Sequence, residues 1–172
     1  MSRSELIVII LSFKKKVAFQ DDLVRNLNSI SLIQRAIYKA IKVVDDKFNV
    51  HVFTDSEEIR LIAERNNIQC YLDANLELDK NSLFYAIKNY LNKYKYKHAL
   101  FISPYAPLLP TELIENAKNE FYKSDKDVLK PIKLIKQDLY DRDAKTSSDI
   151  LFGSQHKLHS LESKSFTLVR TC

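Results

Sequence analysis

Two hydrophobic patterns at the start of the chain predict a buried strand followed by an amphipathic helix. Residues 6–11 (LIVIIL) form a continuous apolar run, as in a strand that is buried on both faces. In residues 31–44, apolar side chains recur every three or four positions, which places them on one side of a helix. The connection, residues 12–30, is polar, cationic and longer than a simple turn requires. A long loop after a buried strand is where α/β proteins commonly bind a ligand.

The alternation of strand and helix patterns continues to about residue 130. Further strands are predicted for residues 48–53, 67–72, 98–102 and 166–169. Further helices are predicted from about residue 56, over residues 82–94 and over residues 111–121. Residues 128–135 indicate another strand, which Pro131 restricts to an edge or an irregular position. This order predicts an α/β fold with a mostly parallel central sheet flanked by helices, in a single domain of residues 1–172.

The composition is typical of a soluble globular protein. The 172 residues are 45% hydrophobic and 28% charged, which suits one domain with a sizeable core. No apolar run has the length of a membrane span, and residues 1–20 do not resemble a signal peptide, so we expect a cytoplasmic protein without membrane partners. The net charge of +5 is spread along the chain without an aromatic-interleaved basic stripe. We therefore expect no nucleic-acid partner.

The scarcity of glycine limits the kinds of phosphate site that the chain can form. Its one glycine, Gly153, lies far from the first loop. Loops that press their backbone against phosphates need glycine, which excludes Walker-type and dinucleotide-type loops. The first loop instead carries cations that can neutralise phosphate as point charges, namely Lys14, Lys15, Lys16 and Arg25. A solvated basic loop explains the same run of lysines, and both interpretations stay open.

Residues 54–59 (TDSEEI) carry the most specific motif of the chain. The spacing of Asp55 and Glu58 predicts that Asp55 caps the helix that follows. The six residues also reproduce a motif of the acylneuraminate (CMP-sialic acid) cytidylyltransferases, which activate acidic sugars with CTP. Residues 103–109 (SPYAPLL) resemble the Gln-Pro-Thr-Ser-Pro-Leu-Arg segment of this family. The resemblance extends over about residues 6–111.

The signature loop of the family is the part that differs. Its Gly-Gly-Ser segment falls on Lys14, Lys15 and Lys16, so the loop has the length of the family's loop without its glycines. Other residues of the family that contact ligands are replaced at Phe13, Val17, Asp22, Leu23 and Leu109. Hydrophobic side chains at the positions of two family arginines remove cations that would stabilise phosphate charge.

The resemblance implies a Rossmann-like nucleotide-diphospho-sugar transferase fold, with CTP, an acidic sugar and Mg²⁺ as ligands. It places the nucleotide near Leu11, Ser12, Lys14, Lys15, Lys16, Arg25, Ser103 and Pro104. It places the sugar near Asp55, Ser56, Asp79 and Ser82. Asp141 and Asp143 are the candidates for Mg²⁺. It also implies a homodimer, formed through residues after Val128.

Two functions are compatible with these observations. The first is cytidylyl transfer at a reduced rate, from CTP and a nonulosonic acid to a CMP-sugar and pyrophosphate, for a surface polysaccharide. The second is a catalytically inactive module of the same fold that acts in binding, dimerisation or regulation. No catalytic residue can be assigned from the sequence.

Overall fold

The computed structural model describes residues 6–14, 21–75, 80–93, 96–135, 159–162 and 166–170. The chain forms two compact units. The larger one comprises residues 1–129 and 164–172, and the smaller one comprises residues 130–163. In the smaller unit, β8 (Ile132–Ile135) pairs antiparallel with β9 (His159–Glu162).

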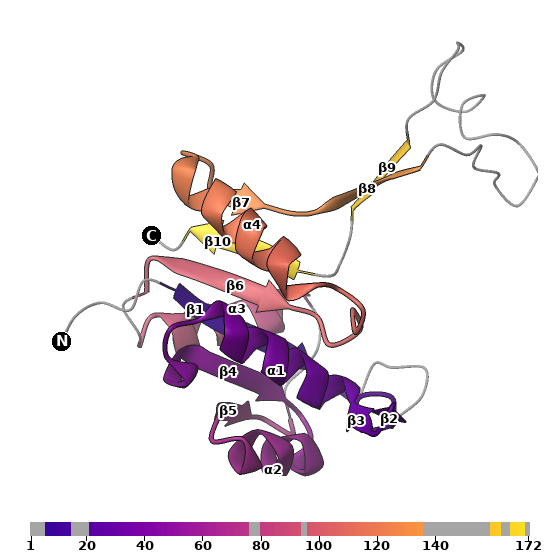
Figure 1. Ribbon diagram of the computed structural model, residues 1–172. Helices are drawn as coiled ribbons and strands as arrows, with labels where there is room; N and C mark the ends of the chain where they lie inside the picture. Colours follow the sequence, from indigo (N-terminus) through magenta and orange to yellow (C-terminus); the bar gives the residue numbers. More distant parts are fainter. Residues whose placement is uncertain are drawn as a thin grey trace, which may run out of the picture. The chain divides into compact units, whose positions relative to one another are not determined.

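The centre of the larger unit is β1 (Leu6–Ser12), which lies between two parallel neighbours (Figure 1). On one side Val8 pairs with Val50 of β4 (Val50–Thr54), and on the other it pairs with Leu100 of β6 (His98–Ile102). The prediction that these three apolar segments form adjacent parallel strands is therefore confirmed.

Three further strands complete the sheet, whose order is β5-β4-β1-β6-β10-β7. β5 (Gln69–Leu72) extends the parallel part beside β4. β10 (Phe166–Arg170) pairs antiparallel with β6, and β7 (Val128–Leu129) pairs antiparallel with β10. The predicted strand over residues 128–135 is thus two strands, β7 and β8, on either side of Pro131, which has no N–H for a sheet ladder.

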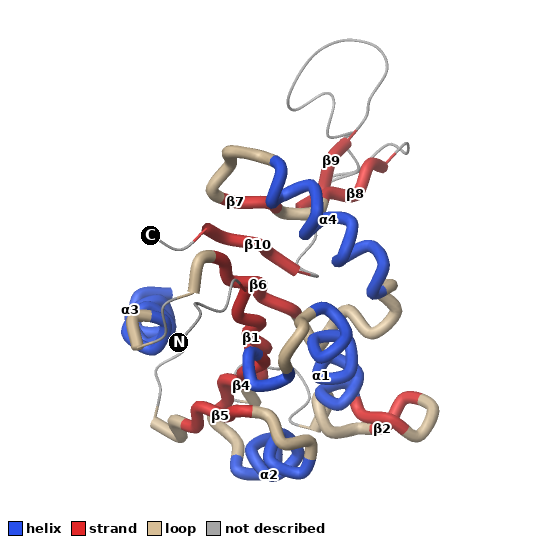
Figure 2. The backbone as a smooth tube through the Cα atoms, turned by 60° about the vertical axis from the view of Figure 1, so that its left-hand side comes forward, coloured by secondary structure: helices blue, strands red, loops and turns tan. Residues whose placement is uncertain are grey.

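Helices cover both faces of the sheet (Figure 2), which explains why β1 is apolar at successive positions. One face packs against α1 (Leu32–Val43), α2 (Glu57–Arg65) and α4 (Thr111–Lys123), and the other packs against α3 (Lys80–Leu91). Val8 and Ile10 point into the first layer, whereas Ile7 and Ile9 pack with Tyr90 of α3. None of the described helices is long and apolar enough to cross a membrane.

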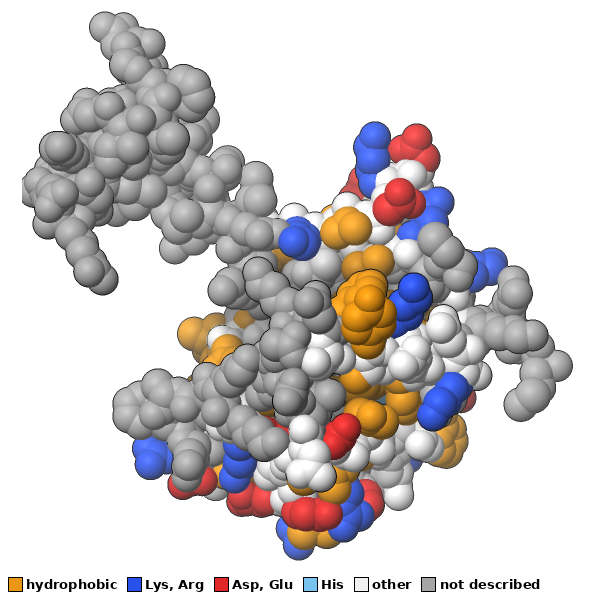
Figure 3. Space-filling view, turned by 180° about the vertical axis from the view of Figure 1, so that it is seen from behind, with side chains coloured by type: hydrophobic (Ala, Val, Ile, Leu, Met, Phe, Trp, Pro, Cys, Tyr) orange, Lys and Arg blue, Asp and Glu red, His pale blue; other side chains and the backbone are white. Residues whose placement is uncertain are grey.

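The face that carries α3 is less completely covered. Figure 3 views the protein from this side and shows hydrophobic side chains grouped near the centre of the surface. A cavity of about 440 Å³ lies between α3 and the strands β6 and β10. Its apolar lining consists of Phe84, Ile87, Leu91, Ala99, Phe101 and Val169.

The start of α1 is fixed by a short hairpin and by a side-chain cap. β2 (Asn26–Leu27) and β3 (Ile30–Ser31) pair across Asn28 and Ser29, whose φ angles are 52° and 66°. Asparagine tolerates this left-handed conformation, so the turn forms without glycine. The Ser31 hydroxyl then accepts a hydrogen bond from the N–H of Gln34, and the Gln34 side chain accepts one from the N–H of Ser31.

Candidate functional site at the carboxyl edge of the sheet

The carboxyl ends of β1, β4 and β6 meet at one edge of the sheet because the three strands are parallel and adjacent. Ser12 at the end of β1 pairs with Thr54 at the end of β4, and Asp55 and Ser56 follow directly. Ser103 and Pro104 follow β6 at the same edge. The structure therefore brings together predicted nucleotide and sugar residues from three segments, as an open α/β sheet does at a ligand site.

Lys14 is held by carboxylates at this edge. Its backbone N–H donates to Asp55 Oδ1 at 2.8 Å, and its ammonium donates to Glu58 Oε2 at 2.6 Å. The ammonium also lies 3.6 Å from Asp21 Oδ1, and the side chain is 20% exposed. These partners, above all the hydrogen bond to Glu58, raise the pKa of Lys14 above its ordinary value. Lys14 is consequently charged, but acidic side chains already neutralise much of that charge.

The predicted role of Asp55 as a helix cap is wrong. Ser56 is the N-cap residue of α2, and its side chain makes no capping hydrogen bond. Asp55 precedes the cap, and its carboxylate accepts the N–H of Lys14 instead. The reason is tertiary, because the loop after β1 passes the end of β4 and offers a backbone donor there. The N–H of Ser56 is in turn bonded to Thr54 Oγ1 at 3.1 Å.

Ser12 has a buried hydroxyl at the same edge. The residue is 0% exposed, and its Oγ has no hydrogen-bond partner within the part of the chain that the structure describes. A buried hydroxyl without a partner costs free energy, so its presence beside a strand end is unusual for a purely structural position. Leu11, the preceding candidate, instead packs into the core beneath α3.

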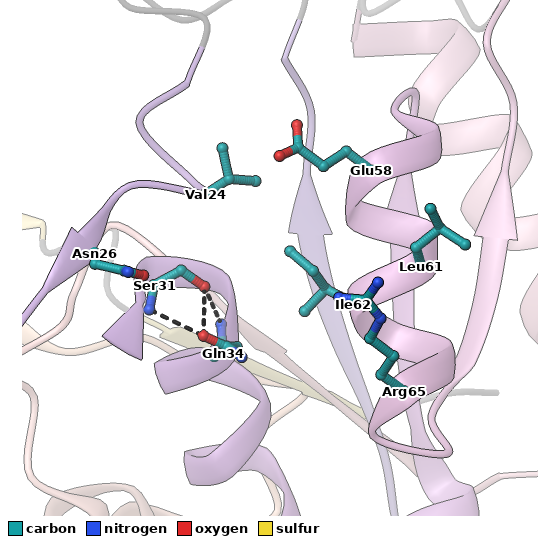
Figure 4. A pocket seen from close by; sticks show the side chains of 8 residues that line it. All are labelled: Val24, Asn26, Ser31, Gln34, Glu58, Leu61, Ile62 and Arg65. Atoms are coloured by element: carbon teal, nitrogen blue, oxygen red, sulfur yellow. Dashed lines mark hydrogen bonds between the residues drawn. The ribbon is translucent and has the colours of Figure 1, made fainter. Parts of the chain in front are cut away.

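A cavity of about 390 Å³ lies between the start of α1 and α2 (Figure 4). Val24, Asn26, Ser31 and Gln34 line it from the first loop and α1. Glu58, Leu61, Ile62 and Arg65 line it from α2. The walls thus combine apolar side chains with a carboxylate, a guanidinium and amides. Such a mixture suits a polar organic ligand.

Sequence reasoning had not selected the polar residues of this cavity as a site. Glu58 was visible within the TDSEEI motif, but the motif drew attention to Asp55 and Ser56. Gln34 was visible as the residue three positions after Ser31, which is the pattern of a capping box. Asn26 and Arg65 had no signal of their own, because only the packing of the hairpin beside α2 brings them to one cavity.

Several residues that replace the family's ligand contacts are structural here. Leu23 is 1% exposed and belongs to the larger core, and Leu109 packs against that core. Phe13 packs against the core beneath α3. All three side chains contribute packing, and by the resemblance two of them, Phe13 and Leu109, stand at the positions of family arginines.

Some of the remaining predicted residues lie within the described ranges, and others do not. Arg25 is exposed in the first loop, and Ser82 is part of the first turn of α3. The others lie outside the described residues, namely Lys15, Lys16, Asp79, Asp141 and Asp143. Within the described ranges, no group of three His, Cys, Asp or Glu side chains is arranged to hold a metal ion.

Comparison with known proteins identifies related sequences and folds. A family model described as cytidylyltransferase matches residues 21–163. No curated protein matches the chain. A solved structure of CMP:2-keto-3-deoxy-manno-octonic acid synthetase complexed with CTP is similar, with a TM-score of 0.74 and 11% identity over 97% of this chain and 74% of that chain.

Two further solved structures resemble this fold at similarly low identity. A cytidylyltransferase from Leptospira borgpetersenii has a TM-score of 0.64 and 11% identity over 98% of this chain and 61% of that chain. The bifunctional IspDF from Campylobacter jejuni has a TM-score of 0.66 and 12% identity over 97% of this chain and 41% of that chain. The predicted nucleotide-diphospho-sugar transferase fold is therefore confirmed.

Proposed function

The chain belongs to the cytidylyltransferase family, and we propose that it binds CTP at the carboxyl edge of its sheet for the activation of an acidic sugar. In this reaction a hydroxyl oxygen of a nonulosonic acid bonds to the α-phosphorus of CTP. The bond from that phosphorus to the bridging oxygen breaks, and pyrophosphate leaves with the electron pair. The hydroxyl proton passes to water, since the described residues provide no assigned base. The products are a CMP-sugar and pyrophosphate.

Four observations support a nucleotide at this edge. The family model covers most of the chain. A neighbour with the same fold was solved with CTP. The loops after β1, β4 and β6 converge at the edge, where Ser12 retains a buried hydroxyl without a partner among the described residues. The cavity beside Glu58 and Gln34 provides polar groups next to the same loops.

We propose that transfer by this chain is slow, and the Lys14–Glu58 ion pair is the observation that carries this part of the proposal. A lysine that serves a triphosphate must exchange its carboxylate partners for phosphate oxygens. Here the ammonium is bonded to Glu58 and lies close to Asp21. Phe13 and Leu109 contribute packing in place of cations. Loss of one preorganised group that stabilises transition-state charge commonly costs about 10²–10³-fold in rate.

The same ion pair favours a second candidate function, a binding or regulatory module without catalysis. In that role the edge of the sheet would retain nucleotide affinity, while the carboxylates around Lys14 prevent the phosphates from reaching a reactive arrangement. The two candidates share a CTP site and differ in turnover. We further propose that the chain is a cytoplasmic homodimer whose contacts come mainly from residues after Val128.

We propose that Mg²⁺ binds together with the triphosphate and would neutralise part of the phosphate charge. In proteins Mg²⁺ is usually held by one or two carboxylates together with substrate phosphates. Asp55 and Glu58 have the right donor atoms, but both accept hydrogen bonds from Lys14. The described residues therefore do not form a ready metal site, and no catalytic step is assigned to a resident ion.

Binding of CTP tests the part of the proposal that both candidates share. Thermal unfolding would be followed at rising CTP concentration with Mg²⁺, with ATP at the same concentrations as the comparison. A ligand that binds only the folded state raises the melting temperature. We expect a saturable rise with CTP that is reduced in Ser12→Ala, which removes the buried hydroxyl and adds no volume at this fully buried position. No rise at any CTP concentration would refute the proposed site.

A further inference from the structure

A second group of cations surrounds a cavity on the outer side of α1, and we propose that this cavity binds a compact phosphate anion such as pyrophosphate or inorganic phosphate. The cavity has a volume of about 220 Å³. Its lining consists of Ile30, Arg35, Tyr38, Lys39, Lys42, Pro107 and Thr111. We call it the α1 cationic cavity. None of these residues belongs to the candidate CTP site.

The charge of this cavity is one-sided. Arg35, Lys39 and Lys42 are spaced at i, i+4 and i+7, which places all three on one side of α1. The lining contains no aspartate or glutamate, and within the described residues none of the three cations forms an ion pair. Like charges at these spacings destabilise a helix, so an anion in the cavity would relieve a repulsion that the described residues leave uncompensated.

Two of the cations are fixed in the wall of the cavity. The Lys39 ammonium donates to the carbonyl oxygens of Ala106 at 2.6 Å and Pro107 at 2.8 Å. Burial, followed by the neighbouring charge of Arg35, lowers the pKa of Lys39. Arg35 donates to the carbonyl oxygen of Leu27. Carbonyl oxygens orient these groups without cancelling their charge, so the positive field of the cavity is held in place before a ligand arrives.

The first turn of α4 strengthens the same field. Thr111 is the first residue of this 13-residue helix and lines the cavity. The N-cap position is Pro110, which makes no side-chain hydrogen bond to the turn. The first backbone N–H groups of α4 therefore donate no hydrogen bond to the side chain of the N-cap residue, and the positive end of the helix dipole adds to the cations of α1. Figure 1 shows α1 and α4 side by side on one face of the sheet.

The size of the cavity selects the class of anion. Pockets for drug-sized ligands commonly have volumes of about 300–1,000 Å³. At about 220 Å³ the α1 cationic cavity is smaller than these, which favours a phosphate or pyrophosphate over a whole nucleotide. Pyrophosphate carries more charge than phosphate at neutral pH, and we expect it to bind more tightly to three cations.

The cavity is also connected to the candidate CTP site. Lys39 binds the loop that leaves β6, and this loop begins with Ser103 and Pro104 at the carboxyl edge. An anion that draws the Lys39 ammonium toward itself would compete with the carbonyl oxygens of Ala106 and Pro107. Occupancy of the α1 cationic cavity would therefore alter the restraint on that loop.

The test uses the full chain, with pyrophosphate and inorganic phosphate titrated in separate arms at low ionic strength. Backbone amide shifts by NMR locate the anion, and calorimetry measures its affinity. We expect saturable shifts at Thr111 and Glu112 and tighter binding of pyrophosphate. Lys42 is exposed, so Lys42→Ala should fold normally, as thermal unfolding will verify. This variant should weaken binding by about 10-fold, the loss of one charge-assisted contact.

Lys88→Ala is the matched control, because it removes one positive charge from α3 on the opposite face of the sheet. It should bind pyrophosphate as the unaltered chain does. Equal weakening by the two variants would reduce the effect to net charge and overturn the site. Absence of saturation, or shifts confined to Lys14 and Asp55, would overturn it as well. Shifts confined to Lys14 and Asp55 would still be consistent with the proposed CTP site. The experiment can therefore refute the α1 cationic cavity without refuting the CTP site.

Discussion

The backbone N–H of Lys14 donates a 2.8 Å hydrogen bond to the carboxylate of Asp55, a residue 41 positions further along the chain. This contact joins the loop after β1 to the loop after β4 at the edge where the ligand site is proposed. It also gives Asp55 a tertiary role in place of the local capping role that its sequence context predicts. The contact fixes the path of the first loop beside the start of α2.

Replacement of Asp55 should destabilise the protein through the loss of this contact. Asp55→Ala leaves the N–H of Lys14 without its carboxylate, and we expect a loss of about 1–2 kcal/mol in the free energy of unfolding. Urea denaturation measures the change. Ser56→Ala is the comparison, since the Ser56 side chain makes no capping bond and its removal should cost less than about 0.5 kcal/mol. A larger effect at Ser56 than at Asp55 would contradict this assignment.

Release of Lys14 from its ion pair should strengthen nucleotide binding. Glu58→Gln removes the carboxylate that accepts from the ammonium at 2.6 Å and leaves a side chain of the same shape. We expect CTP to bind several-fold more tightly at low salt, and the gain to shrink as ionic strength rises. Calorimetry with CTP and Mg²⁺ measures this. The gain should vanish in the Glu58→Gln, Lys14→Ala double variant, and its persistence there would show that Lys14 is not responsible.

His51 should make stability depend on pH below neutrality. It is 1% exposed, and its Nδ1 lies 2.7 Å from the Tyr90 hydroxyl. Burial lowers its pKa from 6.5 to about 4. The unfolded chain therefore takes up a proton below pH 6.5 that the folded chain does not, so stability is lost as the pH falls from 6.5 to about 4. At about 1.4 kcal/mol per pKa unit, the loss approaches roughly 3 kcal/mol.

Comparison with His51→Gln isolates this contribution from that of the carboxylates. Denaturant unfolding would be measured for both proteins between pH 4 and pH 7. The difference in free energy of unfolding between the two proteins should change across this interval in the direction given above. Parallel pH profiles would show that His51 is not the titrating group.

Cys70 should react slowly in the folded protein. Burial raises the pKa of its thiol to about 11, so the reactive thiolate is scarce at pH 8. In a Cys172→Ser background, reaction with a disulfide reagent should be at least about 10-fold slower in the folded chain than in urea. Equal rates in the two conditions would contradict the partly buried position of Cys70, which lies on β5 and packs against the larger core.

Much of the fold was predictable because its signals are local. The apolar run around Val8 indicated a strand buried on both faces, and the apolar stripe within residues 31–44 indicated the helix α1. The pairing of β10 with β6 was not predictable, because residues about 65 positions apart carry no shared pattern. The antiparallel end of the sheet therefore emerged only from the structure.

The sequence was sufficient to predict that the candidate site lies at the carboxyl edge of the sheet. It was not sufficient to predict which side chains contact Lys14 there. Parallel strands bring their carboxyl ends together, so Ser12, Asp55 and Ser103 were expected at one edge. The partners of Lys14 were not, since a lysine after a strand suits a phosphate or a carboxylate equally. The acidic side chains of Glu58 and Asp21 decide between these, and only the tertiary structure places them there.

Pyrophosphate release from CTP in the presence of Mg²⁺ and a panel of nonulosonic acids tests the central proposal most directly. A CMP:2-keto-3-deoxy-manno-octonic acid synthetase with its own substrate serves as the positive control. We predict CTP binding with turnover about 10²–10³-fold below that control, or none, because carboxylates engage Lys14 and packing residues occupy the positions of family cations. Robust turnover that is abolished in the Lys14→Ala, Lys15→Ala, Lys16→Ala triple variant would contradict the account and make the lysine loop an active phosphate site.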